Sequence, residues 1–173
     1  MSFGFDQTLD RREAILERLM ELGQGISGIA STWRNPRPLP TGKFADYPRP
    51  MFLLYDSGGK AEQDPLRHKR PGMPPTQFSI SPQIVVVLEM RDTVDNTTVD
   101  GIADPVGSEI SGWITLINST ITNDAQIIDL VTPNGAFYLS AFETDLKVGR
   151  TVGAYGAWLM MLYEFRYPLY PPR

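Results

Sequence analysis

The sequence predicts an α+β fold, in which a mostly antiparallel β-sheet has an N-terminal helix and one or two central helices packed on one face. Two regions, about residues 8–24 and 108–131, repeat their apolar residues at helical spacing. The other apolar segments are short and rich in β-branched or aromatic residues, which is typical of strands. The predicted elements are grouped and do not strictly alternate, and this grouping favours α+β over α/β.

The composition indicates one folded domain over residues 1–173. Of these residues, 42% are hydrophobic and 21% are charged, and a chain of this size buries about two-thirds of its unfolded surface. The 15 prolines and 15 glycines gather in the connections. We expect a long loop at 57–76 and an extended C-terminal tail at 167–173.

Residue counts exclude several classes of enzyme. Cysteine is absent, so the chain has no disulfide, thiol nucleophile or thiolate metal site. His68 is the only histidine, and it lies between Pro65 and Pro71 among basic residues, a setting typical of a solvated loop. Any Ser-His-Asp arrangement would depend on this one residue.

The overall charge and hydropathy argue against nucleic-acid and membrane binding. The net charge is −4, whereas dedicated nucleic-acid binders usually carry a basic excess. The longest apolar run has about a dozen residues, fewer than the roughly 20 that a membrane-spanning helix needs, and no secretory signal is visible. We therefore expect no membrane segment and a cytoplasmic location.

The first predicted element is an amphipathic helix from Thr8 to Gln24. Its apolar stripe comprises Ile15, Leu19, Leu22 and Ile26. Gly23 and Gly25 are placed for a left-handed C-terminal cap. An acidic ridge on the outer side consists of Glu13, Glu17 and Glu21. We expect this ridge to be solvated.

Three strands follow, with the long loop between the second and the third. They cover Gly28–Asn35, Pro50–Tyr55 and Phe78–Met90. Pro36 ends the first strand because proline cannot donate to a strand ladder. Ser81 and Pro82 interrupt the third strand, which indicates a bulge or a strand start.

The next loop, Asp92 to Pro105, contains the densest cluster of carboxylates. Its members are Asp92, Asp95, Asp100 and Asp104. Carboxylate oxygens suit hard cations, but the spacing fails the pattern of a calcium-binding loop. We interpret the segment as a solvated connection and expect no metal site.

Two central helices and a strand are predicted next. Ser108 begins an amphipathic helix, and a shorter helix covers Asp124–Val131. The sequence Pro133-Asn134-Gly135 is a turn signal that leads into a strand over Ala136–Phe142. The glycine-rich segment Gly149–Gly156 opens a strand, whereas a phosphate-binding loop should open a helix.

The last predicted strand, Ala154–Phe165, is apolar on both of its alternating faces. One face carries Tyr155, Ala157, Leu159, Met161, Tyr163 and Phe165, and the other carries Gly156, Trp158, Met160 and Leu162. A strand that is apolar on one face needs a single layer of helices over it. The second face therefore needs a second layer, which in a chain this short can be another subunit. We predict that Trp158, Met160 and Leu162 lie at an interface.

Two further segments are predicted to contact neighbouring molecules. Arg67, Lys69 and Arg70 form the only dense basic cluster, and they lie on the long loop. Such cations can contact phosphates or an acidic neighbouring subunit, and a solvated loop is the alternative interpretation. Tyr167 and Tyr170 lie in the predicted C-terminal tail and are the aromatic residues that this tail can offer to a neighbour.

Short segments occur along the chain in an order that matches a known family. They are Arg12–Leu19, Trp33–Asn35, Leu39–Pro40, Pro48–Pro50, Pro82–Val87, Asn134–Gly135, Thr144–Leu146 and an aromatic strand ending near Tyr163. This order resembles the tail terminator, or tail completion, proteins of long-tailed bacteriophages. The resemblance covers most of the chain, except for the long loop and the C-terminal tail.

The resemblance implies a structural virion protein of the tail–neck junction, assembled in the host cytoplasm. Members of the family form a hexameric ring that caps the tail tube, ends its polymerisation and provides the docking surface for the head and neck. It also implies that the chain is not an enzyme and has no catalytic, cofactor-binding or metal-binding residues. The implied partners are the tail tube protein and a neck or head-completion protein, while DNA passes through the ring without specific binding.

The residues leave other functions open. One is another neck adaptor, such as a head-completion or head–tail joining protein. Another is a metal-dependent enzyme that uses the Asp92–Asp104 carboxylates. A third is a monomeric module that binds a peptide or a small ligand.

Overall fold

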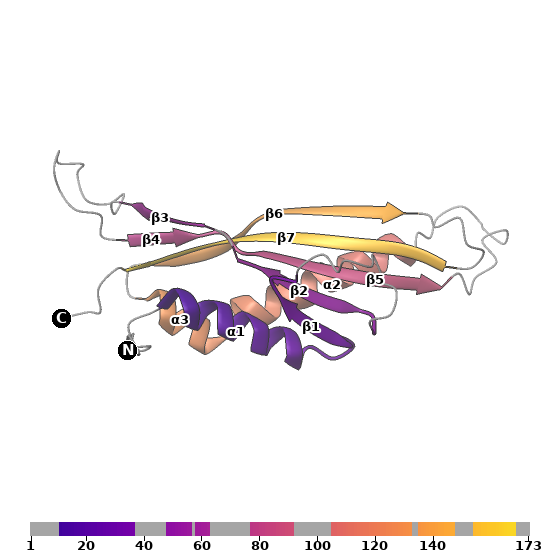
Figure 1. Cartoon of the computed structure of the whole chain (residues 1–173), viewed down its shortest axis with the longest axis horizontal. Coiled ribbons are helices and arrows are strands. Elements are labelled where there is room, and N and C mark those ends of the chain that lie inside the picture. The colour runs from indigo at the N-terminus through magenta and orange to yellow at the C-terminus, as the bar shows by residue number, and fades with distance from the viewer. Residues whose placement is uncertain are drawn as a thin grey trace.

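The computed structural model describes residues 11–36, 48–56, 58–62, 77–91, 105–132, 135–147 and 154–168. Within these residues the chain forms three helices and a seven-stranded, mostly antiparallel sheet, which confirms the predicted α+β class (Figure 1). The helices are α1 (Arg11–Gly25), α2 (Pro105–Thr122) and α3 (Ala125–Val131). The strands are β1 (Ser31–Arg34), β2 (Met51–Tyr55), β3 (Gly59–Glu62), β4 (Gln77–Ile80), β5 (Gln83–Arg91), β6 (Ala136–Lys147) and β7 (Ala154–Pro168).

Strand β7 is the centre of the sheet. One of its edges pairs with β6, and the other pairs with β5 and β4, which lie end to end. Strands β2 and β3 flank β5 and β4 in turn, and β1 pairs with β2. Only the β1–β2 pair is parallel among the described strands. The result is a long, narrow sheet with β6 on one edge and β1 and β3 on the other (Figure 1).

The interruption between β4 and β5 is a strand start without a bulge. Ile80 lies opposite Phe165 and Gln83 lies opposite Leu162, so both strands keep the same register along β7. The N–H of Tyr163 donates to the carbonyl of Pro82 at 3.1 Å, which continues the ladder across the gap. Pro82 has no N–H to donate, so the hydrogen-bond ladder is interrupted there, but β4 and β5 keep the same register along β7.

The prediction of a loop over residues 57–76 is wrong at residues 59–62, which form strand β3. Residues 59–62 pair antiparallel with residues 77–80 and add an edge strand to the sheet. The sequence Gly-Lys-Ala-Glu has no strand-like alternation, and its pairing depends on the backbone groups that β4 offers. Residues 63–76 lie outside the described part of the chain.

Two other boundaries differ from the predictions at positions of unusual backbone geometry. The first strand begins at Ser31 and ends at Arg34, because Gly28 (φ 95°) and Asn35 (φ 47°) turn the chain on either side. Gly23 is not a helix cap, since α1 continues through it. A Cβ atom there would lie 2.6 Å from the ring of Phe52, so Gly23 lets the helix approach the sheet.

All three helices pack against the same face of the sheet, as predicted. On β7, Leu159, Met161, Tyr163 and Phe165 are each 0% exposed and share one core with residues of α1, α2 and α3. Tyr163 also donates a hydrogen bond from its hydroxyl to Asn118 Oδ1 of α2 at 3.1 Å. Burial raises the pKa of Tyr163, so it remains a neutral donor. None of the described helices is both long and apolar enough to span a bilayer.

Candidate interaction surface

The sheet face that points away from the helices carries the three predicted interface residues of β7. Trp158, Met160 and Leu162 alternate with the buried core residues and are half-buried. Their partners on β5 are Val87, Val85 and Gln83, respectively, and these are half-buried as well. We call these six residues the outer face.

The outer face is bounded on two sides. Towards β2 the same side of the sheet is covered, because Met51 and Leu53 are only 1% and 3% exposed. Towards the C-terminal end of β7, Glu164 accepts hydrogen bonds from the Tyr138 hydroxyl and from Arg166 Nε, both at 2.8 Å. Burial opposes the ionisation of Glu164, but these two donors outweigh it and lower the pKa of its carboxyl. The outer face is therefore a mostly apolar strip that ends in a polar cluster whose hydrogen bonds are satisfied. On its β6 side, Glu143 lies opposite Met160.

The remaining predicted interface residues are not part of the outer face. Tyr167 belongs to β7, points into the core and is 5% exposed, with its ring centroid 6.1 Å from that of Phe78. The predicted tail at 167–173 thus begins inside a strand, because β7 extends to Pro168. The predicted contact residues Arg67, Lys69, Arg70 and Tyr170 lie outside the described residues.

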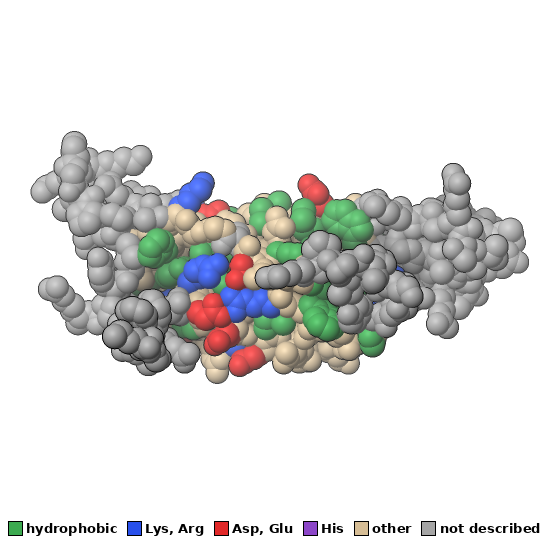
Figure 2. Space-filling view, viewed as in Figure 1, with side chains coloured by type: hydrophobic (Ala, Val, Ile, Leu, Met, Phe, Trp, Pro, Cys, Tyr) green, Lys and Arg blue, Asp and Glu red, His purple; other side chains and the backbone are tan. Residues whose placement is uncertain are grey.

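Strand β6 forms a long exposed edge that the sequence did not predict. It has 12 residues, and among the described strands it pairs only with β7. Phe142 is 57% exposed and Tyr138 is 42% exposed. In Figure 2, hydrophobic side chains reach the surface where β6 runs in Figure 1. The sequence predicted a shorter strand because Glu143 and Asp145 interrupt its apolar pattern.

A bulge at Ser140 divides β6 into two halves. Leu139 lies opposite Tyr163, whereas Ala141 lies opposite Leu162, so Ser140 is the extra residue. The Ser140 hydroxyl donates to the carbonyl of Leu162 at 2.9 Å and fixes the bulge against β7.

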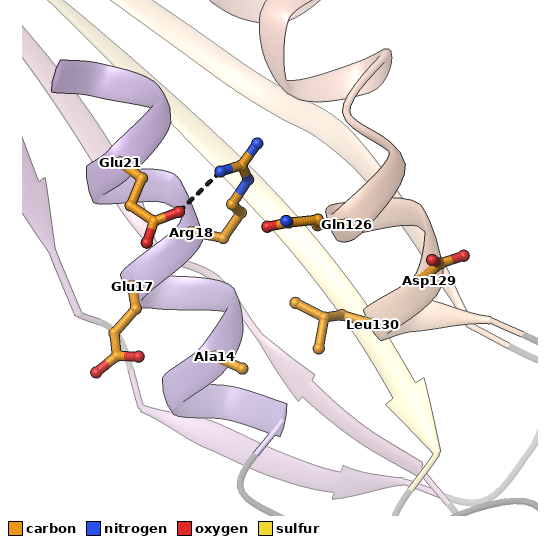
Figure 3. A pocket seen from close by; sticks show the side chains of 7 residues that line it. All are labelled: Ala14, Glu17, Arg18, Glu21, Gln126, Asp129 and Leu130. Atoms are coloured by element: carbon orange, nitrogen blue, oxygen red, sulfur yellow. Dashed lines mark hydrogen bonds and ion pairs between the residues drawn. The ribbon is translucent and has the colours of Figure 1, made fainter. Parts of the chain in front are cut away.

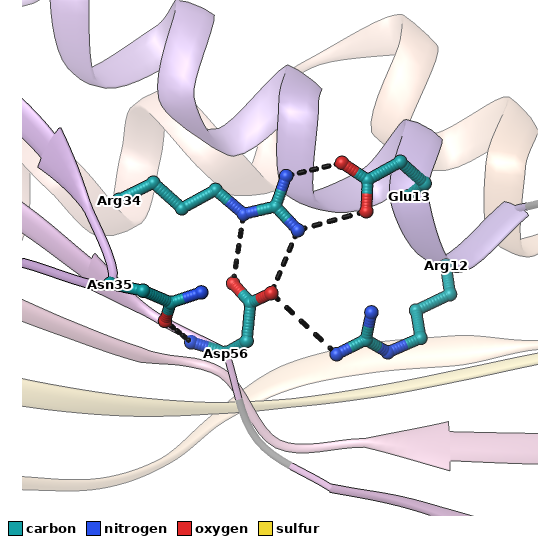
Figure 4. A network of polar contacts seen from close by, with 5 residues as sticks. All are labelled: Arg12, Glu13, Arg34, Asn35 and Asp56. Carbon is teal, nitrogen blue, oxygen red and sulfur yellow. Dashed lines mark hydrogen bonds and ion pairs between the residues drawn. The ribbon is translucent and has the colours of Figure 1, made fainter.

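The densest polar network joins α1 to the ends of β1 and β2 (Figure 4). Arg34 donates to both oxygens of Glu13 and, at 3.0 and 2.7 Å, to both oxygens of Asp56. Arg12 lies 3.7 Å from Asp56, and Asn35 Oδ1 accepts from the Asp56 N–H. Hydrogen bonds from Arg34 lower the pKa of both carboxyls. Every member has a partner, so the network holds the fold and offers no free acid or base.

The acidic ridge of α1 is consequently not solvated throughout, since Glu13 pairs with Arg34 and Glu21 pairs with Arg18 at 2.7 Å. Behind this ridge, an open groove of about 380 Å³ separates α1 from α3 (Figure 3). It is lined by Ala14, Glu17, Arg18, Glu21, Gln126, Asp129 and Leu130. Arg18 is also held by Asp124, at 2.7 Å, so the groove contains no unpaired cation within its lining. The groove has no pair of groups arranged as a nucleophile and its base.

Within the described residues, no group of three or more acidic or histidine side chains is arranged to hold a metal ion. The carboxylates of Asp92–Asp104 lie outside that part of the chain, and the prediction for them stays a prediction. No protein-family model matches the chain, and no curated protein matches it. The candidate functional feature of the described structure is thus a pair of surfaces, namely the outer face and the β6 edge.

Proposed function

We propose that this chain is a structural virion protein that forms a ring on the end of a phage tail tube. The ring ends polymerisation of the tube and provides the docking surface for the head and neck. The observation that carries the proposal is the outer face, where Trp158, Met160 and Leu162 lie on the side of the sheet opposite the helices. The order of elements resembles the tail terminator family, and this resemblance is the reason why we propose a ring on a phage tail tube.

The outer face has the chemistry of a subunit contact. Aromatic residues and methionine are enriched at the centres of protein interfaces. Complete burial of a large apolar side chain contributes about 1.5–3 kcal/mol relative to full exposure. Because Trp158, Met160 and Leu162 are already partly buried, at most about a third of this remains to be gained when a neighbour covers them.

The overall charge suits a ring through which DNA passes. The net charge is −4, and a negatively charged lumen repels the phosphate backbone and lets the duplex slide. In this proposal the ring is a hexamer located at the tail–neck junction. Its other partners are the tail tube protein and a neck or head-completion protein, and it has no enzymatic role.

Electron microscopy of particles that lack the protein tests the proposal. Deleting the gene from the phage that carries it should give overlong tubes of variable length beside filled, unattached heads. Tails of normal length beside emptied or unjoined heads would instead assign the chain to the neck, as a head-completion or head–tail joining protein. Normal infectious particles would overturn both assignments.

The metal-dependent alternative has a separate test. A cation that binds only the folded state must raise the melting temperature. We expect magnesium, manganese and calcium to leave the melting temperature of the purified protein unchanged. A rise that Asp100→Asn and Asp104→Asn together abolish would reassign the loop at residues 92–105 to metal binding.

A further inference from the structure

The free edge of β6 exposes backbone groups that can pair with another strand. The N–H of Tyr163 points from β7 towards Pro82, and successive residues of a strand direct their N–H and C=O groups to opposite sides. The β7 residues whose backbone N–H and C=O groups point towards β6 are therefore the even-numbered ones, including Leu162 and Met160. Their partners Ala141 and Glu143 face β7, so Phe142 and Thr144 direct their N–H and C=O groups away from the sheet.

This edge has only part of the usual protection against strand addition, namely the bulge at Ser140 and the charged residues near its C-terminal end. Natural edge strands are commonly short, rich in lysine or interrupted by proline. In contrast, β6 has 12 residues, contains no proline and has Lys147 as its only cation, at its last position. Side chains from Ser140 to Thr144 are all exposed.

The opposite edge of the same sheet is complementary to β6 in direction. Strand β1 runs parallel to β2, β2 and β7 are both antiparallel to β5, and β6 is antiparallel to β7. It follows that β1 and β6 run in opposite directions. If a second copy continues the sheet in the same orientation, its β1 meets β6 as an antiparallel partner, which is the more stable arrangement per residue.

Strand β1 also has backbone groups to offer. The N–H groups of Ser31 and Asn35 donate to the carbonyls of Pro50 and Leu54, at 3.4 and 2.8 Å. By the same alternation, Thr32 directs its N–H and C=O groups away from β2. Thr32 and Thr144 lie in one row across the sheet, through Phe52, Val86 and Leu159, so both side chains point to the helix side.

We propose that the free edge of β6 pairs with β1 of a second copy of this chain, so that the sheets of neighbouring subunits join into one. The inference rests on the proposed ring and names the contact that builds it. A contact between two different surfaces of the same subunit closes into a ring when the rotation permits. The sequence also argues against pairing of β6 with itself, because Glu143 and Asp145 give β6 an acidic stretch. Pairing of β6 with itself would bring the acidic stretches together, and like charges on paired strands are destabilising.

Proline substitutions test the pairing, because the outward N–H groups of Thr32 and Thr144 take no part in the pairing of the described strands. Thr144→Pro removes the outward donor of β6, and Thr144→Val is the matched control that keeps it. We expect the wild type and Thr144→Val to assemble, and Thr144→Pro to remain a folded monomer, as measured by sedimentation velocity and circular dichroism. Assembly of Thr144→Pro at wild-type concentrations would overturn the pairing and leave the ring itself standing.

The reciprocal variant tests which edge is the partner. Thr32→Pro removes the outward donor of β1 and should also give a monomer. A mixture of Thr144→Pro and Thr32→Pro should form dimers and nothing larger, since each variant retains one intact edge. Dimers of Thr32→Pro alone would show that β6 pairs with itself and would overturn the proposal.

Hydrogen exchange of the wild type provides a readout that does not depend on how the variants fold. The amides of Phe142 and Thr144 should exchange more slowly at concentrations where the protein is assembled than at those where it is monomeric. Equal exchange rates in the two states, or a wild type that stays monomeric at every concentration, would overturn the pairing. Electron microscopy of the gene-deletion particles tests the proposed function independently of whether β6 pairs with β1.

Discussion

At the scale of single residues, Gly135 occupies a position that no other residue fits. A Cβ atom there would lie 2.0 Å from the carbonyl oxygen of Val131 and 2.1 Å from that of Arg166. Both neighbours are backbone atoms of α3 and β7 and cannot rotate away. We expect Gly135→Ala to lower the free energy of unfolding by about 3 kcal/mol, measured by urea denaturation.

Gly112 provides the matched control for that substitution. It lies in the interior of α2, and a Cβ atom added there meets nothing within 4 Å. Since alanine is favoured over glycine inside a helix, Gly112→Ala should raise the free energy of unfolding by about 0.5–1 kcal/mol. Equal effects of the two substitutions would contradict the close approach at Gly135.

Asp124 combines two roles that one substitution can separate. Its carboxylate accepts from Arg18 Nε and Nη2, at 3.1 and 2.7 Å, and from the Ile127 N–H at 2.9 Å as the N-cap of α3. The hydrogen bonds from Arg18 are the largest cause that lowers the pKa of Asp124. Asp124→Asn keeps a good cap residue but loses the charge, so it should reduce the free energy of unfolding by about 1–2 kcal/mol near pH 6.

The same substitution predicts a pH dependence. A carboxyl with a lowered folded-state pKa stabilises the fold above its unfolded pKa of about 3.9, and this contribution is lost as the pH falls through the folded-state value. The difference in unfolding free energy between wild type and Asp124→Asn should therefore shrink as the pH is lowered from 5 to below about 3. A difference that stays constant over this range would rule out the charge as its source.

At the scale of elements, β7 supports both the fold and the proposed assembly. Trp158→Asp places a carboxylate on the outer face beside Val87, where burial of an unpaired charge is unfavourable. We expect the variant to have a lower melting temperature and to lose assembly, measured by thermal denaturation and sedimentation. Trp158→Phe keeps an uncharged aromatic side chain at this position and should assemble normally. Normal assembly of Trp158→Asp would remove Trp158 from the interface.

The elements that could be predicted from the sequence are those whose signal is local. The stripe of α1 and the two-faced pattern of β7 both depend on side-chain spacing, and both are found in the structure. Strand β3 has no such signal because its pairing with β4 joins residues separated by a long segment. Tyr167 was misplaced for a related reason, since prolines indicated a tail where β4 holds the chain in register. The exposed edge of β6 likewise follows from strand order, which no single segment encodes.

At the scale of the whole molecule, the two faces and the two edges of the sheet differ in what they can contact. The helix side buries the core, the outer face presents half-buried apolar residues, and the two edges run in opposite directions. In Figure 2, most of the charged side chains gather over the α1 region, where several are paired with one another, and a few others reach the surface near β3 and β6. Among the described residues, the surfaces left for assembly are accordingly mostly apolar or made of backbone groups, apart from the acidic stretch of β6. The basic sequence at residues 67–70 lies outside the described residues.

That basic sequence gives the last prediction, which concerns docking and not folding. Replacing Arg67, Lys69 and Arg70 by alanine should leave the melting temperature unchanged, because the sequence predicts that these residues lie on a loop. Loss of three cations should weaken attachment to an acidic neighbour, more so at low than at high salt, because salt screens exposed charges beyond about 10 Å. The triple exchange Arg67→Lys, Lys69→Arg and Arg70→Lys keeps every charge and should join heads to tails as the wild type does. Unchanged head–tail joining in the alanine variant, scored by electron microscopy of infected cells, would exclude this segment as a contact and leave assembly to the outer face and the sheet edges.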